Sequence, residues 1–171
     1  MKKEKWYRNS EMLVALTALF IGLLTAFISI YSAYIDRAYA KASVWPKVEI
    51  FRSHSEGRFS YGVSNKGTGP AIIKYAKVKS GSQFLEKWSD LPEFKLISQS
   101  HLSTITLPSN QTVEPLKYQG DSVSDILALD QTVQIELCYC SIYEDCWMVN
   151  RSNKTNPVQE CVVSSEQAFM Q

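Results

Sequence analysis

The residues from Met12 to Ile35 form one apolar run without a single charged side chain. A helix rises about 1.5 Å per residue, so a run of this length covers the roughly 30 Å hydrocarbon core of a bilayer. The alternative is the buried helix of a soluble protein, but such a helix carries charges on one face, and this run has none. The sequence therefore predicts a single transmembrane helix at 12–35, with the lipid bilayer as its partner.

The apolar run divides the chain into unequal parts. It leaves a cytoplasmic tail at 1–11, a juxtamembrane connector at 36–46 and a domain at 47–171 that carries all four cysteines. The size of this last part favours one folded domain. The connector is expected to continue the helix as far as Trp45-Pro46, because the residue before a proline avoids the helical region.

The flanking charges indicate the direction of the helix. Four basic residues precede it within the first eight positions, namely Lys2, Lys3, Lys5 and Arg8. The positive-inside rule therefore favours a cytoplasmic N-terminus. The cysteines support the same direction, because an even number confined to one side suits an oxidising compartment. We expect a single-pass protein of the cytoplasmic (inner) membrane, with the N-terminus inside and the C-terminal domain extracytoplasmic.

A cleavable signal peptide is the competing interpretation. Ala38-Tyr39-Ala40 has the small-x-small form of a cleavage site. The apolar run, however, is much longer than the roughly 7–15 residues of a signal peptide, and Asp36 and Arg37 separate it from that site. These features favour an uncleaved signal-anchor.

Small residues recur every fourth position within the run, at Ala18, Gly22 and Ala26. Such a stripe lets two helix backbones approach closely in lipid. The stripe is a candidate surface for self-association or for contact with another membrane protein. Small residues are also common in membrane helices generally, which explains the stripe equally well.

The domain is predicted to be mainly β. Phe59, Tyr61 and Val63 alternate with small residues in the period-two pattern of a half-buried strand. Eight strands are expected, at Val48–Arg52, Phe59–Ser64, Ala71–Lys79, Leu102–Leu107, Thr112–Tyr118, Thr132–Ile142, Cys146–Arg151 and Val158–Ser164. Strands at this spacing favour an antiparallel sandwich. Two short helices are expected as well, one at Leu85–Ile97, interrupted by Pro92, and one at Ser122–Leu129, capped by Asp121 or Ser122.

A turn between two of these strands carries a family resemblance. Asn65-Lys66-Gly67-Thr68-Gly69-Pro70-Ala71 is similar to a junction found in bacterial immunoglobulin-like adhesion and cell-surface modules. Together with Trp45-Pro46 and Cys138-Tyr139-Cys140-Ser141, the layout resembles uncharacterised bacterial single-pass membrane proteins with a small exported sandwich. The resemblance implies an immunoglobulin-like β-sandwich but no activity, since sandwiches carry many unrelated functions.

The cysteine positions predict two disulfides. Alternation along 132–142 places Cys138 and Cys140 side by side on the more polar face of one strand, where a bond between them is sterically poor. Cys146 opens the return strand, so Cys140, nearer the turn, is placed to meet it. This leaves Cys138 to pair with Cys161.

Two chemical roles compete with disulfides. A redox pair needs a thiolate with a lowered pKa, whereas Cys138 and Cys140 lie in mid-strand beside Glu136. A structural zinc site prefers Cys-x2-Cys pairs, which the chain lacks. We therefore expect neither a metal nor a cofactor.

The remaining motifs give little support to catalysis. His54 and His101 are the only histidines, and the chain has no Gly-x-Ser-x-Gly elbow and no phosphate-binding loop. Three glycosylation sequons begin at Asn110, Asn150 and Asn153, and in a bacterial chain these are polar turns. A formal net charge of +1 does not indicate a nucleic-acid partner.

We therefore expect a membrane-anchored, non-catalytic interaction module, an accessory or sensor subunit of a membrane complex. Its partner would be another membrane or envelope protein. The loop around Lys66 and Thr68 is a candidate contact, because loops on a rigid scaffold often carry binding sites. Its glycines and proline are explained equally by turn geometry. The alternative function is an extracytoplasmic enzyme, a hydrolase or thiol oxidoreductase, with its site at the rim of the sandwich.

Overall fold

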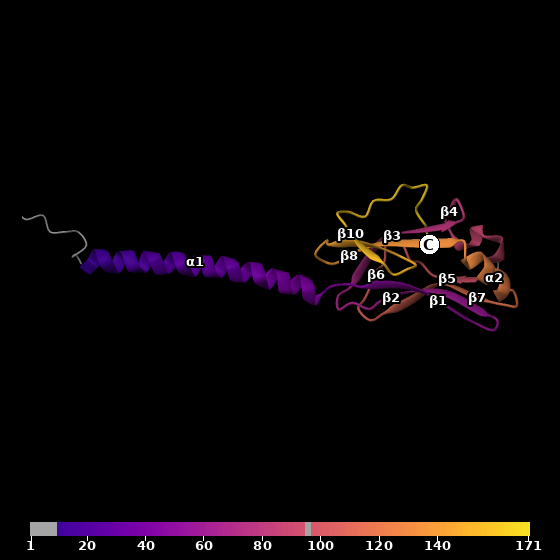
Figure 1. Cartoon of the computed structure of the whole chain (residues 1–171), viewed down its shortest axis with the longest axis horizontal. Coiled ribbons are helices and arrows are strands. Elements are labelled where there is room, and N and C mark those ends of the chain that lie inside the picture. The colour runs from indigo at the N-terminus through magenta and orange to yellow at the C-terminus, as the bar shows by residue number, and fades with distance from the viewer. Residues whose placement is uncertain (1–9, 95–96) are drawn as a thin grey trace, which may run out of the picture. The chain divides into compact units, whose positions relative to one another are not determined.

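The protein is described by a computed structural model that covers residues 10–94 and 97–171 (Figure 1). Its internal contacts divide the chain between Ala42 and Ser43 into two compact units. The first unit contains the helix α1, and the second, Ser43–Gln171, is called the β domain below. Most of the predicted tail at 1–11 lies outside the described residues.

Helix α1 spans Ser10–Ser43 and is 34 residues long. Its side chains are largely exposed, and its length and apolar composition are sufficient to cross a membrane. Several of its hydroxyl groups are bonded within the helix: Thr25 donates to the carbonyls of Ile21 and Gly22, and Ser29 donates to that of Thr25. Such bonds allow these hydroxyl groups to lie in an apolar environment, because each of them is paired.

The β domain consists of two antiparallel sheets (Figure 1). This confirms a mainly β fold that follows one long apolar helix in the sequence. The first sheet has the order β1 (Val48–Ser55), β2 (Arg58–Asn65), β7 (Thr112–Gln119) and β5 (Ile97–Gln99). The second has the order β10 (Thr155–Val158), β9 (Cys146–Asn150), β8 (Val133–Cys140), β3 (Ala71–Ser80) and β4 (Gln83–Leu85), with β6 (Thr106–Leu107) also paired to β3. The immunoglobulin-like classification stays a prediction.

The core is built from the inward-facing residues of both sheets and from a group of aromatic rings. Tyr61 of β2 stacks on Trp88 at 5.1 Å between ring centroids, and Trp88 contacts Phe169 near the C-terminus at 5.0 Å. The strand predicted to be half-buried is buried on both faces. The ring of Phe51 covers Gly62 on its outer side, so closely that an added Cβ would meet the ring.

The helix predicted at Leu85–Ile97 is not a continuous α-helix in the described residues. The described part of this segment contains two short 3-10 turns, η2 (Trp88–Asp90) and η3 (Pro92–Phe94). The carboxylate of Asp90 accepts the backbone N–H groups of Glu86 and Lys87, and this local bonding competes with a helix. The second predicted helix is present as α2, Val123–Asp130, although the side chain of Ser122 makes no capping bond.

Two predicted strands are largely wrong. Only Thr106–Leu107 of the strand expected at Leu102–Leu107 is paired. Strand β10 ends at Val158, where the last predicted strand was expected to begin. Beyond Val158 the chain leaves β10, which lies at one edge of the second sheet, and continues to Phe169, which pairs with Ala76 of β3. The segment 159–168 therefore crosses the outer face of that sheet.

Candidate functional site

The four cysteines lie where this crossing segment covers β8. Disulfides join Cys138 to Cys161 and Cys140 to Cys146, the pairing that the strand register predicts. Cys138 and Cys140 were expected on a polar face, but both are buried beneath the crossing segment. The first bond therefore fastens the C-terminal segment to the sheet, and the second closes the hairpin of β8 and β9.

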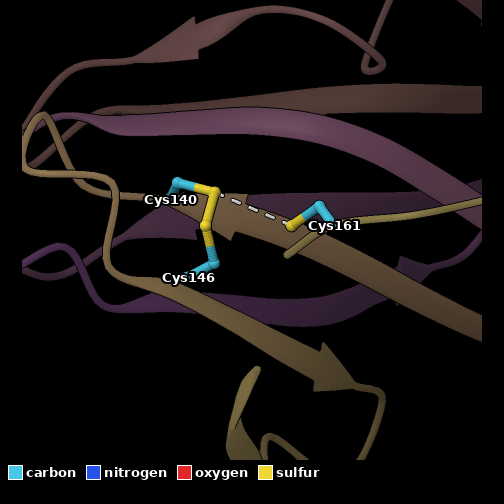
Figure 2. A group of neighbouring side chains, drawn as sticks. All are labelled: Cys140, Cys146 and Cys161. Atoms are coloured by element: carbon cyan, nitrogen blue, oxygen red, sulfur yellow. Dashed lines mark hydrogen bonds between the residues drawn. A yellow bond between two sulfur atoms is a disulfide. The ribbon is translucent and has the colours of Figure 1, made fainter. Parts of the chain in front are cut away.

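The two disulfides are in contact with each other. The Sγ atoms of Cys140 and Cys161, which are not bonded, lie 3.7 Å apart (Figure 2). The Sγ atom of Cys146 completes a group of three within 4.8 Å. All four thiols are consumed in disulfides, so in this oxidised form the group offers no thiolate to a metal.

The loop at 65–70 holds the segment through which the chain enters the β domain. The buried amide of Asn65 accepts the backbone N–H groups of Lys47 and Gly67 and donates to the carbonyl of Gly69. The backbone N–H of Thr68 donates to the carbonyl of Trp45 at 3.0 Å. The loop thus has a structural role as a turn that clamps the entering chain.

Both glycines of this loop are required by close backbone contact. A Cβ atom at Gly67 would lie 2.3 Å from the carbonyl oxygen of Trp45, and one at Gly69 would lie 1.9 Å from that of Val44. The side chains of Lys66 and Thr68, by contrast, are exposed, although the hydroxyl of Thr68 also donates to the carbonyl of Trp45 at 3.4 Å. These two candidate contact residues are therefore available at the surface, while the glycines beside them are explained without a partner.

The stripe of Ala18, Gly22 and Ala26 lies on α1. All three residues are exposed, and a Cβ atom at Gly22 would meet nothing within 4 Å. The helix therefore leaves the space above Gly22 open for another helix.

A polar hollow of about 520 Å³ surrounds His54 and is lined by Ser60, Glu114 and Lys117, among others. Ser60 donates to Glu114 at 2.9 Å, and Lys117 pairs with the same carboxylate at 2.7 Å. These two bonds lower the pKa of Glu114. Among the described residues, no hydrogen bond joins His54 to a hydroxyl group. His101 is exposed in the loop before β6.

Another hollow, of about 810 Å³, is lined by several cationic side chains and is called the basic groove below. Its charged lining consists of Arg52, Lys77, Lys79, Arg151, Asp130 and Glu136. Lys77 pairs with Glu136 at 3.2 Å, and both arginines bind Asp130. Four cations thus face two carboxylates, which leaves an excess of positive charge.

Asp130 organises one wall of the basic groove. Its carboxylate is almost fully buried and accepts the hydroxyl of Tyr61 at 2.6 Å and Nη2 of Arg151 at 2.6 Å, and Arg52 also binds it. Burial and the bond to Asp130 raise the pKa of Tyr61 far above its usual range. The side chain of Arg52 remains 45% exposed. Part of this guanidinium therefore faces solvent in the groove.

The sequence did not reveal this groove. Its cations come from β1, β3 and the end of β9, and they are far apart in the chain. Only the sheet register, which places Lys77 opposite Glu136 and Lys79 opposite Gln134, brings part of the lining together.

Comparison with known proteins finds no family model and no curated protein that matches the chain. The resemblance to exported immunoglobulin-like modules stays a prediction. The geometry of the chain itself is the basis of the functional proposal.

Proposed function

We propose that the protein is a membrane-anchored, non-catalytic interaction module that presents its β domain outside the cytoplasmic membrane. One observation carries the proposal. A helix long and apolar enough to cross a membrane is followed at once by a β domain whose four cysteines all form disulfides. Stable disulfides suit an oxidising compartment, and this supports a position of the domain outside the cytoplasm.

The length of α1 supports an anchor rather than a signal peptide. The helix continues without interruption through Ala38-Tyr39-Ala40, the candidate cleavage site, and ends at Ser43. The uncharged run within this helix is also much longer than the roughly 7–15 apolar residues of a signal peptide. The uncleaved helix then tethers the β domain close to the membrane surface.

An interaction role suits the surfaces that the chain offers. The small-residue stripe on α1 fits a second helix, and the basic groove on the β domain fits a group of opposite charge. A partner that engages both would be another membrane or envelope protein, with this chain as its accessory or sensor subunit. Self-association through α1 is the other arrangement that the stripe permits.

The test is purification of the C-terminally tagged full chain from native membranes. We expect the chain to resist alkaline carbonate extraction, to keep the residues before Lys41 by intact-mass spectrometry, and to co-purify with a membrane or envelope protein. Release by carbonate, or a mature chain that starts at Lys41, would contradict the anchor. Purification of the chain alone and monomeric, after mild solubilisation and crosslinking, would contradict the interaction role.

A further inference from the structure

Strand β1 (Val48–Ser55) forms one edge of its sheet and is the longest edge strand of the β domain. The other edge strands, β5, β4 and β10, have only three or four residues each. In an antiparallel strand the N–H and C=O groups of alternate residues point to the same side. An edge strand therefore presents a row of backbone groups that can pair with another chain.

The first half of this edge is already occupied. Asn153, in the loop between β9 and β10, accepts the backbone N–H of Ile50 at 2.8 Å and donates to its carbonyl at 3.1 Å. The backbone N–H and C=O groups of Ile50 therefore point away from β2. By the alternation of the strand, Arg52 and His54 direct their backbone groups to the same open side.

The second half of the edge is open. The residues from Phe51 to Ser55 are exposed, and no described residue makes a hydrogen bond to the outward backbone groups of Arg52 or His54. Two N–H and two C=O groups are thus available in a row. Pairing with a short extended segment would satisfy all four.

The basic groove adjoins this open edge. Arg52 belongs to both, because its backbone lies in the edge and its side chain lines the groove. Lys79 also lines the groove, where its ammonium lies over an aromatic face rather than beside a carboxylate, 5.8 Å from the ring centroid of Phe84. A strand added to β1 would therefore direct its alternate side chains toward positive charge.

We propose that the open edge of β1 binds an extended acidic segment of a partner protein by strand addition. The segment's backbone pairs with Arg52 and His54, and its carboxylates, at alternate positions, enter the basic groove. Main-chain bonds then supply affinity and the groove supplies selectivity. The inference names the partner chemistry of the proposed interaction module and rests on that function. A second copy of β1 is a poor occupant, because it would bring like charges together.

The test uses the full chain in nonionic detergent and three fluorescent eight-residue peptides. The first alternates valine with glutamate, and the second alternates valine with lysine. The third is the acidic peptide with N-methyl groups on alternate amides, which removes the donors along one edge. We expect the acidic peptide to bind at least tenfold more tightly than either of the others. Equal binding of the acidic and N-methylated peptides would overturn strand addition, and equal binding of the acidic and lysine peptides would overturn the charge argument.

Two pairs of variants locate the site. His54→Pro removes one outward N–H without removing a bond to β2, so it should weaken binding of the acidic peptide about tenfold. His54→Ala keeps the N–H and should change binding of the same peptide less than twofold. Lys79→Gln should weaken binding severalfold, whereas Lys74→Gln, on the same strand but outside the groove, should not. Thermal unfolding verifies that each variant is folded. The N-methylated peptide tests strand addition in the unsubstituted protein.

Unchanged binding to both His54→Pro and Lys79→Gln would overturn the site, as would a failure of the acidic peptide to bind at all. Neither result would affect membrane integration or co-purification of the partner, which are measured without the peptide. Failure of this inference is therefore distinguishable from failure of the proposed function.

Discussion

Arg151 binds Asp130 through both ends of its guanidinium: Nη2 donates to the carboxylate at 2.6 Å, and Nη1 donates to the backbone carbonyl at 2.8 Å. Asp130 ends α2, and Arg151 follows β9. The pair therefore connects the helix to the second sheet. Tyr61 and Arg52 bind the same carboxylate from the first sheet, so one buried side chain links both layers.

Replacement of this carboxylate should be costly. Asp130→Ala leaves Nη2 of Arg151 and the hydroxyl of Tyr61 without their acceptor. Breaking a buried pair in this way costs about 3–5 kcal/mol. Tyr61→Phe removes a single hydrogen bond and should cost about 1 kcal/mol. Thermal unfolding followed by tryptophan fluorescence compares the two. A smaller loss for Asp130→Ala than for Tyr61→Phe would contradict this account of the network.

The loop at 65–70 should tolerate changes at its surface but not at its close contacts. Gly69→Ala places a methyl group against the backbone of Val44 and should destabilise the β domain by about 1–3 kcal/mol. The double substitution Lys66→Ala and Thr68→Ala changes exposed side chains. Its unfolding temperature should stay within about 2 °C of that of the parent chain, because surface substitutions change stability little. A stable Gly69→Ala variant would contradict the clamp. Loss of partner co-purification in the folded double variant would show that the loop also takes part in recognition.

The contact between the disulfides predicts a specific rearrangement. In Cys146→Ala the thiolate of Cys140 is free beside the Sγ atom of Cys161, at 3.7 Å in the parent chain. Its attack forms a Cys140–Cys161 bond and releases Cys138 as a thiolate, so no external oxidant is needed. Peptide mapping without reduction should find this bond at alkaline pH. If peptide mapping finds only the original Cys138–Cys161 bond after prolonged incubation, the prediction is contradicted.

The disulfides should also differ in their effect on stability. By loop-closure entropy, the bond between Cys138 and Cys161 contributes about 3.4 kcal/mol and the smaller ring about 2 kcal/mol. The double substitutions of each pair to alanine, compared by thermal unfolding, measure this difference. A larger loss from removal of the Cys140–Cys146 pair would contradict the order.

The stripe on α1 gives a prediction about association. Gly22→Leu fills the open space on the helix face and should weaken helix–helix association several-fold in a membrane reporter assay. Leu23→Ile, at the neighbouring position, is the matched control and should leave association unchanged. Equal signals from both variants would show that the stripe reflects only the composition of the helix.

The elements that the sequence predicted well depend on patterns within one segment. The uncharged run from Met12 to Ile35 requires a long apolar helix, and the alternation along 132–142 sets both a strand and the positions of its cysteines. Gly67 and Gly69 indicated a turn, although the close contacts that require them became visible only in the fold.

The elements that the sequence missed depend on contacts between distant segments. The segment 159–168 was expected to be partly a strand, but its course across the sheet is determined by Cys161 and by the pairing of Phe169 with β3. The basic groove was missed for a related reason. A formal charge of +1 over the whole chain conceals a local excess that the fold assembles from Arg52, Lys79 and Arg151.

The orientation of the chain is tested most directly by protease protection in sealed inside-out vesicles of the cytoplasmic membrane. The full chain would carry one epitope before Met1 and another after Gln171. If the β domain lies outside the cytoplasm, added protease should remove the first epitope and leave a protected fragment with the second, until detergent opens the vesicles. Digestion of the C-terminal epitope in intact vesicles, with the N-terminal epitope protected, would contradict the account.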